Sequence, residues 1–267
     1  MKKIGFIGCG NMSQAMIGGV VKAGIFQGKN ILVSDLNKNS LESAANKYGV
    51  TTTTDNLEVA KGSDILVLAV KPNLYNVIIS QIKDTVKSDV IIVTIAAGKS
   101  IESTETAFGK NIKVVRVMPN TPALVGEGMS SMVPNKLIET HELEEVITVF
   151  ESFGSTEVVE EKLMDVVTSV SGSAPAYVYM FIEAMADGAV LDGMPRDKAY
   201  KMAAQTVLGA AKMVMETGMH PGQLKDMVCS PGGTTIEAVT TLEKKGLRDA
   251  VITAMRSCTE KSKKMSK

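Results

Sequence analysis

The stretch Lys3-Ile4-Gly5-Phe6-Ile7-Gly8-Cys9-Gly10-Asn11-Met12-Ser13 leads from an apolar strand through a glycine turn into a helix-forming segment. The turn follows the pattern G-x-G-x-x-[G/A], in which a pyrophosphate sits on the helix amino terminus. Gly8 allows the tight turn, Gly10 lets the backbone approach a phosphate, and Ser13 stands where a third small residue is usual. A purely structural strand-to-helix turn is the alternative interpretation.

Up to about residue 160, short β-branched runs alternate with helix-patterned segments. Continuous apolar runs are typical of strands buried on both faces, and this alternation is that of βαβ units. The predicted strands cover residues 3–7, 31–34, 65–69, 90–94 and 114–117, and the predicted helices cover residues 13–23, 40–48, 56–61, 74–83 and 143–150. The sequence therefore predicts an α/β fold, in which residues 1–162 form a dinucleotide-binding Rossmann domain with a doubly wound parallel sheet.

From about residue 165 the β-branched runs stop, and the chain becomes rich in Ala, Met, Glu and Lys. These residues favour helices, and glycine and proline clusters separate the helical segments. The predicted helices cover residues 175–191, 196–217, 222–228, 235–245 and 247–264. We expect residues 163–267 to form a second, all-helical domain.

Charge and composition exclude several classes of partner. The 29 basic and 29 acidic side chains cancel, so no net field draws the chain to nucleic acid or to an anionic membrane. The apolar segment 177–191 is shorter than the roughly 20 residues of a membrane span. Three cysteines without paired metal-ligand spacing predict free thiols, no metal site and a reducing cytoplasm, and we expect no secretion signal. The expected partners are small molecules or copies of the chain itself.

Asp35 ends the second predicted strand, about 20 residues after the glycine turn, where a carboxylate accepts hydrogen bonds from the adenine ribose of NADH. Ser34, Asn37 and Lys38 are close enough in sequence to contact the 2′-phosphate of NADPH, although Leu36 stands where an arginine would serve that purpose better. The choice between NADH and NADPH therefore stays open. Asp35 is alternatively a residue that only caps the turn.

Ligands of open α/β sheets sit beyond the carboxyl ends of the strands. Three segments with unusual chemistry follow predicted strands there: Val70-Lys71-Pro72-Asn73, Ala96-Ala97-Gly98-Lys99 and Met118-Pro119-Asn120-Thr121-Pro122. Asn120 offers both a donor and an acceptor, as recognition of a nicotinamide carboxamide requires. A rigid proline turn packed for stability is the alternative interpretation of the last segment.

The sequence offers few strong proton donors for a reduction. Its two histidines, His141 and His220, lie in polar or turn segments typical of the surface. Hydride transfer to a ketone needs a strong proton donor, whereas a readily protonated imine needs only a hydroxyl or water nearby. This shortage favours a C=N substrate.

A second glycine turn runs into a helix at Ser230-Pro231-Gly232-Gly233-Thr234-Thr235. Its backbone N–H groups, with the hydroxyls of Ser230, Thr234 and Thr235, can hold a carboxylate without an arginine. A plain helix cap is the alternative, with Thr234 and Glu237 forming a capping box.

Over essentially its whole length the sequence resembles the pyrroline-5-carboxylate reductase family, which catalyses the last step of proline biosynthesis. The segment 226–237 resembles the signature of that family. The other matching motifs are Ile7-Gly8-Cys9-Gly10-Asn11-Met12, Val70-Lys71-Pro72, Met118-Pro119-Asn120-Thr121-Pro122 and Ser171-Gly172-Ser173-Ala174-Pro175-Ala176-Tyr177.

The resemblance implies the roles of individual residues. The substrate carboxylate is expected on Ser230, Gly232, Gly233, Thr234 and Thr235, and the expected catalytic residues are Lys71 and Thr235, the latter near the ring nitrogen as proton donor or water holder. The expected cofactor contacts, which combine this resemblance with the motifs above, are Gly8, Cys9, Gly10, Asn11, Met12, Ser34, Asp35, Lys38, Asn56, Ala69, Val70, Lys71, Pro72, Ala97, Gly98 and Asn120. The family usually prefers NADPH, and Asp35 followed by Leu36 departs from that preference.

The resemblance also implies an assembly and a reaction. We expect a homodimer through the helical domain, further assembled into a ring of dimers, and the apolar helix 175–191 fits such burial. The expected reaction is reduction of L-1-pyrroline-5-carboxylate to L-proline by NAD(P)H. A reductase of another small cyclic imine or keto acid, and a nucleotide-sensing interaction protein, are the alternatives.

Overall fold

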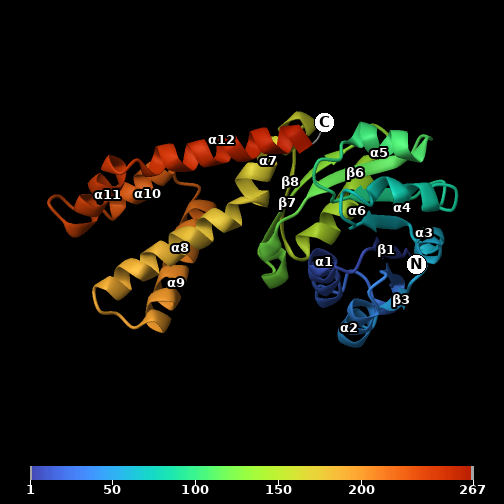
Figure 1. The fold of residues 1–267 in the computed structure, drawn as a ribbon, viewed down its shortest axis with the longest axis horizontal. Helices are drawn as coiled ribbons and strands as arrows, with labels where there is room; N and C mark the ends of the chain where they lie inside the picture. Colours follow the sequence, from blue (N-terminus) through green and yellow to red (C-terminus); the bar gives the residue numbers. More distant parts are fainter. Residues whose placement is uncertain (1, 266–267) are drawn as a thin grey trace. The chain divides into compact units, whose positions relative to one another are not determined.

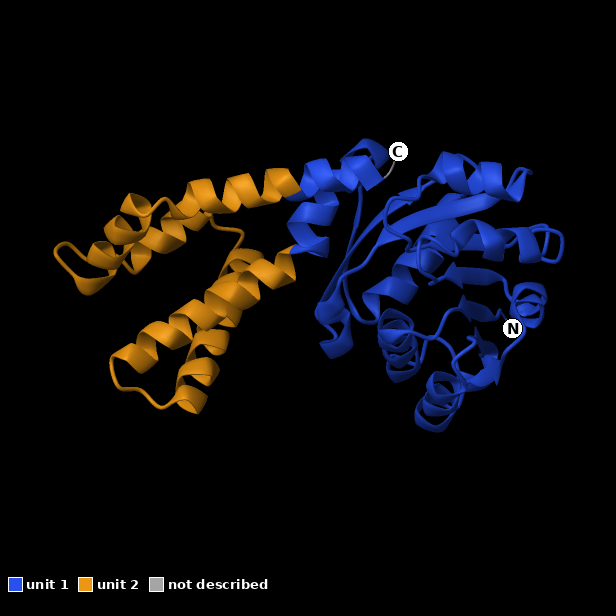
Figure 2. Cartoon of the chain, viewed as in Figure 1, with its two compact units in different colours: residues 1–173, 258–267 blue, residues 174–257 orange. Residues whose placement is uncertain are grey.

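A computed structural model describes residues 2–265 and divides the chain into two compact units (Figures 1 and 2). Among the described residues, unit 1 comprises 2–173 and 258–265, and unit 2 comprises 174–257. Unit 1 contains one eight-stranded sheet with the order β3-β2-β1-β4-β5-β6-β7-β8. The first six strands in this order reproduce the 3-2-1-4-5-6 arrangement of dinucleotide-binding sheets, so the predicted fold class is confirmed.

All five predicted strands are present and run parallel to one another. They are β1 (Ile4–Ile7), β2 (Ile31–Ser34), β4 (Ile65–Leu68), β5 (Ile91–Thr94) and β6 (Lys113–Met118). Their residues are almost all buried, as strands covered on both faces require. Since β1 pairs with both β2 and β4, the chain reverses its winding direction at β1. Ligands bind beyond the carboxyl ends of the strands at such a point.

Three further strands were not predicted from the sequence: β3 (Thr51–Thr53), β7 (Gly128–Pro134) and β8 (Gly154–Val158). β3 and β8 lie at the two edges of the sheet and are half-exposed, so neither has the apolar run of a central strand. β7 runs antiparallel to β6, and β8 runs parallel to β7. These two strands extend the sheet beyond the parallel part that the sequence predicted.

Helices cover both faces of the sheet and create two hydrophobic cores. On one face α1 (Asn11–Lys22), α2 (Lys38–Tyr48) and α6 (Thr140–Glu151) bury Met16, Leu41 and Phe150. On the other face lie α3 (Asn56–Gly62), α4 (Tyr75–Ile82), α5 (Ile101–Phe108) and α7 (Met164–Val167). The strands supply alternate residues to the two cores, as pleated strands do. Helix α5 was not predicted, because five of its eight residues, those between Ile101 and Ala107, are Ser, Thr or Glu.

The segment after β8 closes unit 1. A short 3₁₀ turn (Glu161–Leu163) and α7 lead into a π-helical turn, η4 (Thr168–Gly172). The last turns of α12 (Leu247–Met265), which belong to unit 1 from Cys258 on, join this segment by hydrogen bonds between side chains. These bonds pair Cys258 with Ser173, Thr259 with Ser169, and Ser262 with Asp165.

Unit 2 is entirely helical, as predicted. It contains α8 (Ala174–Leu191), α9 (Arg196–Thr217), α10 (Pro221–Met227), α11 (Thr234–Lys244) and the first part of α12. Helices α8 and α9 pack on each other, but only small residues such as Ala186, Ala199 and Ala203 are buried. None of the helices within residues 2–265 is both long and apolar enough to cross a membrane.

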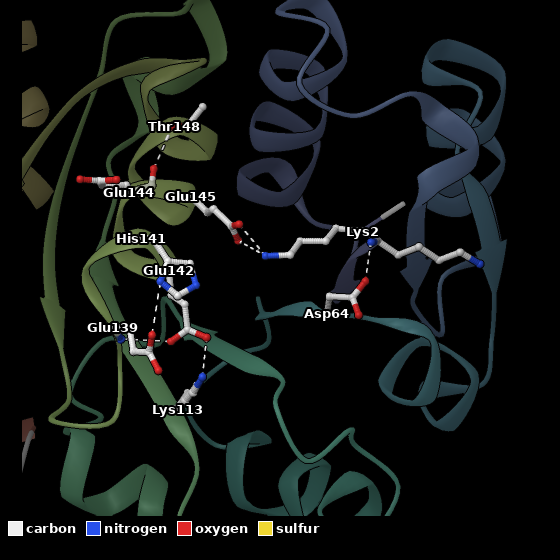
Figure 3. Close-up of polar contacts among 10 residues, drawn as sticks. Lys2, Asp64, Lys113, Glu139, His141, Glu142, Glu144, Glu145 and Thr148 are labelled. Carbon is white, nitrogen blue, oxygen red and sulfur yellow. Dashed lines mark hydrogen bonds and ion pairs between the residues drawn. The ribbon is translucent and has the colours of Figure 1, made fainter.

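Ion pairs link the amino-terminal ends of the parallel strands to neighbouring helices (Figure 3). Glu142 is buried at the start of α6, where its carboxylate accepts hydrogen bonds from the Lys113 ammonium and from the Glu139 N–H. Burial disfavours the charged carboxylate, but these hydrogen bonds and the lysine charge outweigh burial and lower the pKa of Glu142. The pKa of Asp64 is lowered in the same way, against burial, by Lys87 and the Lys3 N–H.

Lowered carboxyl pKa values stabilise the fold at neutral pH and cease to do so in acid, as the pH falls through the folded-state values. We expect Glu142→Gln to lower the free energy of unfolding at pH 7 by about 1–2 kcal/mol, because it removes one charge-assisted hydrogen bond. Denaturant titrations between pH 7 and about pH 3 test this. The control is Glu144→Gln, an exposed residue of the same helix. Equal effects of the two variants, or a deficit that persists in acid, would contradict the pairing.

Candidate functional site

The first glycine turn lies where β1 ends between β2 and β4. Gly8 has φ +104°, a left-handed conformation that favours glycine, and its N–H donates to the Ser34 carbonyl oxygen at 2.8 Å. A Cβ at Gly8 would lie 2.5 Å from the carbonyl oxygen of Ala69, so no larger residue fits there. The turn therefore depends on the absence of a side chain at this position.

Gly10 differs from Gly8 because the fold itself does not require a glycine there. A Cβ at Gly10 would have no neighbour within 4 Å, and the residue is exposed. Gly10 is the N-cap of α1, no side chain caps this helix, and no acidic residue lies in its first turn. The first N–H groups of a helix have no carbonyl partner within it and attract anions. These residues therefore fit a pyrophosphate, held by backbone N–H groups in the space beside Gly10.

Asp35 follows β2 and holds the glycine turn from the side. Its Oδ2 accepts the Cys9 N–H at 2.6 Å, and its Oδ1 accepts the Asn37 N–H at 2.8 Å. Asn37 in turn caps α2 through its side-chain oxygen. The carboxylate of Asp35 is half-buried, and the next side chain, Leu36, is 88% exposed. Asp35 thus caps the turn, as one of the two sequence interpretations held, and its contact with a ribose stays a prediction.

Cys9 lies inside this turn, and its thiol is buried and unreactive. Its side chain is fully buried, and its thiol donates to the Ser40 carbonyl oxygen. Burial, followed by the negative charge of Asp35, raises the pKa of the Cys9 thiol to about 11. The thiol is therefore protonated at neutral pH and serves as a packing residue.

Ser34 and Asn56, two of the expected cofactor residues, contact each other. The buried Ser34 hydroxyl donates to the Asn56 side-chain oxygen at 2.8 Å, and the Asn56 amide donates to Gln81 at 3.2 Å. The sequence did not indicate Gln81, because nothing in the pattern of α4 distinguishes a polar partner from a solvated residue. The side chains of this pair are therefore already hydrogen-bonded to neighbours within unit 1.

Lys38 is exposed at the start of α2, and the other expected cofactor residues follow β4, β5 and β6, at the carboxyl ends of these parallel strands. Lys71, Pro72 and Ala97 are exposed, and Gly98 has φ +75°. Asn120 is buried instead. Its amide donates to the Ser171 carbonyl oxygen at 3.1 Å, and its oxygen accepts the Met129 N–H at 2.8 Å. Asn120 thus holds the π-helical turn and β7, and its contact with a carboxamide stays a prediction.

A partly buried ion pair, which the sequence alone did not indicate, supports the loop after β5. Arg116 is 7% exposed, and its guanidinium donates to Glu161 at 3.1 Å. The same Glu161 oxygen accepts the N–H of Ile101, the first residue of α5, at 2.8 Å. An arginine inside the apolar run 114–118 was the available signal, since a buried charge needs a partner. This pair positions the loop that contains Ala97 and Gly98.

The second glycine turn belongs to unit 2. Gly232 has φ +68°, and the Gly233 N–H donates to the Ser230 carbonyl oxygen at 3.0 Å. Gly233 is the N-cap of α11, so the predicted capping box is wrong: Thr234 already lies inside the helix, which has no side-chain cap. Ser230 and Thr234 are exposed, and Thr235 is half-exposed. The hydroxyls of this turn, and the first N–H groups of α11 that no side chain caps, are therefore available to an anion.

Comparison with known proteins decides the family. Family models match at residues 161–265, described as pyrroline-5-carboxylate reductase dimerisation, and at residues 3–98, described as NADP oxidoreductase, coenzyme F420-dependent. The pyrroline-5-carboxylate reductase of Escherichia coli (strain K12) is 51% identical over 266 residues, which cover 100% of this chain and 99% of that protein. The chain belongs to the pyrroline-5-carboxylate reductase family.

Solved structures of the pyrroline-5-carboxylate reductase family share the whole fold. The enzyme of Coxiella burnetii superposes with a TM-score of 0.94 at 32% identity and covers 100% of this chain and 99% of its own. The Plasmodium falciparum enzyme, solved with NADP bound, superposes with a TM-score of 0.90 at 34% identity and covers 100% and 98%. The resemblance inferred from the motifs is confirmed.

Substitutions at the two glycines of the first turn test stability and cofactor binding separately. We expect Gly8→Ala to lower the free energy of unfolding by at least about 2 kcal/mol, because it combines a clash with an unfavourable φ. Gly10→Ala should change it by less than about 0.5 kcal/mol, yet weaken binding of NADH and NADPH about tenfold or more by filling the phosphate space. Thermal melts and fluorescence titrations measure the two effects. A stable Gly10→Ala protein with unchanged cofactor affinity would contradict the assigned phosphate position.

Ser13, the third small residue of the motif, carries a stability cost. Its hydroxyl is buried and has no hydrogen-bond partner within the part of the chain that the structure describes. We expect Ser13→Ala to raise the free energy of unfolding by about 1 kcal/mol, because a buried unpaired hydroxyl is costly. Ser43→Ala, at an exposed position of α2, is the control for helix propensity alone. A stabilisation by Ser13→Ala no larger than that of the control would show that the hydroxyl is satisfied.

Proposed function

We propose that the chain reduces the C=N bond of L-1-pyrroline-5-carboxylate to L-proline by hydride transfer from NAD(P)H, the final step of proline biosynthesis. The observation that carries the proposal is the 51% full-length identity to the Escherichia coli reductase. The uncapped first turn of α1 beside Gly10 supports a dinucleotide cofactor. When bound, NAD(P)H supplies the hydride from its nicotinamide C4.

The residues of the chain bind and orient the reactants. The cofactor lies along Gly8 to Met12, Ser34, Asp35, Lys38 and Asn56, with Ala69 to Pro72, Ala97, Gly98 and Asn120 toward its nicotinamide end. The substrate carboxylate docks on the turn at residues 230–235 through backbone N–H groups and hydroxyls. Thr235 holds a proton or water at the ring nitrogen, and Lys71 lies beside the reacting groups. Orientation of the two reactants supplies most of the rate enhancement.

The chemistry agrees with the shortage of strong acids near the site. A protonated imine already carries the positive charge that makes its carbon electrophilic. A ketone, in contrast, needs a protein acid that protonates its oxygen as the hydride arrives. His220 donates no proton to substrate in this scheme. Its ring accepts the Gly222 N–H at 3.0 Å, at the start of α10. A hydroxyl such as that of Thr235 is therefore sufficient.

We propose further that residues 1–162 form the cofactor domain and that residues 163–267 form the substrate and dimerisation domain. The dimerisation family model covers residues 161–265. Tyr179, Met180 and Phe181 of α8 are 60%, 69% and 43% exposed, which favours burial against a second copy. A homodimer, further assembled into a ring, is the proposed state. The three free cysteines support the proposal that the protein functions in a reducing cytoplasm.

The direct test is a steady-state assay with L-1-pyrroline-5-carboxylate and either NADH or NADPH. We expect oxidation of the cofactor matched one to one by formation of L-proline. Absence of turnover with both cofactors, in a protein that binds them, would refute the proposed reaction. Turnover on other cyclic imines or keto acids in preference to this substrate would refute the substrate assignment.

The role of Thr235 can be separated from cofactor binding. We expect Thr235→Ala to lower kcat/KM for the imine about tenfold or more, because it removes the hydroxyl near the ring nitrogen. The dissociation constant of the cofactor should stay near that of the unchanged protein. Thr241→Ala, an exposed threonine of the same helix, is the matched control. A loss of cofactor affinity as large as the loss of kcat/KM would contradict the assignment.

A further inference from the structure

The carboxylate of Asp35 is fixed in orientation at the end of β2. Both of its oxygens accept backbone N–H groups, from Cys9 at 2.6 Å and Asn37 at 2.8 Å. The side chain is half-buried, so it keeps surface toward solvent beside the glycine turn. In dinucleotide-binding sheets the residue at the end of this strand lies at the adenine ribose. A carboxylate oxygen has two lone pairs, so each oxygen can still accept a hydroxyl hydrogen.

The neighbours of Asp35 are poorly suited to a 2′-phosphate. Leu36 offers no donor, and the side-chain oxygen of Asn37 is used to cap α2. The Ser34 hydroxyl is fully buried and already donates to Asn56. Within the stretch 34–40 the sequence has one cation, Lys38, which is exposed at the start of α2. A phosphate at this ribose would therefore meet one fixed negative charge and one exposed lysine.

We infer that Asp35 gives this chain a preference for NADH over NADPH, by accepting the 2′-hydroxyl of the adenine ribose and repelling a 2′-phosphate. The inference rests on the proposed function only in placing the cofactor on the first glycine turn. Like charges brought together at a binding site cost several-fold to many-fold in affinity, so we expect a preference of about tenfold or more. The chain would then differ in cofactor from the Plasmodium falciparum relative solved with NADP.

The test uses fragments that lack nicotinamide, so its result does not depend on any reduction. Calorimetry would compare ADP-ribose with 2′-phospho-ADP-ribose on the full-length protein. We expect ADP-ribose to bind about tenfold or more tightly. Equal affinity, or tighter binding of the 2′-phosphorylated fragment, would overturn the inference whether or not the chain reduces the imine.

Asp35→Asn then assigns the preference to the charge. Asparagine keeps the shape and one acceptor oxygen, so we expect the affinity ratio to fall to about threefold or less through tighter binding of the 2′-phosphorylated fragment. The matched control is Asp64→Asn, which also removes a carboxylate that accepts a backbone N–H, but at the amino-terminal ends of the strands. The ratio of the two fragment affinities in this variant should equal that of the unchanged protein. A folded Asp35→Asn protein with an unchanged ratio would contradict the role of Asp35. If that variant fails to fold, the ratio in the unchanged protein still decides the preference.

Discussion

The turn from β1 into α1 depends on the close approach of Gly8 to the carbonyl group of Ala69. Because β1 lies between β2 and β4, its chain must turn into α1 without striking the strand beside it. A Cβ at Gly8 would come within 2.5 Å of that carbonyl oxygen. The turn is then held from its other side by the carboxylate of Asp35, which accepts the Cys9 N–H. The position of the α1 amino terminus, and with it the proposed pyrophosphate site, follows from these two contacts.

Two helices, α1 and α11, share an amino terminus that is suited to bind an anion. Gly10 precedes α1 and Gly233 precedes α11, and neither helix has a side-chain cap. Asn37 at α2, Asp55 at α3 and Ser100 at α5 instead occupy the first N–H groups of their helices with a side-chain oxygen. A glycine N-cap leaves those groups to a ligand, since backbone N–H groups attract phosphate and carboxylate alike. We propose that the first terminus receives the cofactor and the second receives the substrate.

Sequence patterns predicted the parts of the fold that burial dictates and missed those that it does not. The five central strands are continuous apolar runs, and each was found within one or two residues. Strand β3 is three threonines at an edge, and β8 is a half-exposed edge strand, so neither has an apolar signature. At the site, the glycine pattern identified both turns. The sequence did not predict the hydrogen bonds that Asp35, Asn56 and Asn120 form. Their partners Cys9, Gln81 and Ser171 are distant in sequence and come near only in the folded unit.

The central claim is that the cofactor held by the first glycine turn delivers hydride to the imine carbon of a carboxylate held by the second. Transfer of deuterium from NADH or NADPH that carries deuterium at both C4 positions of the nicotinamide tests this claim most directly. The product formed from unlabelled L-1-pyrroline-5-carboxylate should be L-proline with deuterium on C5, the former imine carbon, detectable by NMR. Proline without deuterium, or oxidised cofactor without labelled proline, would contradict direct hydride transfer.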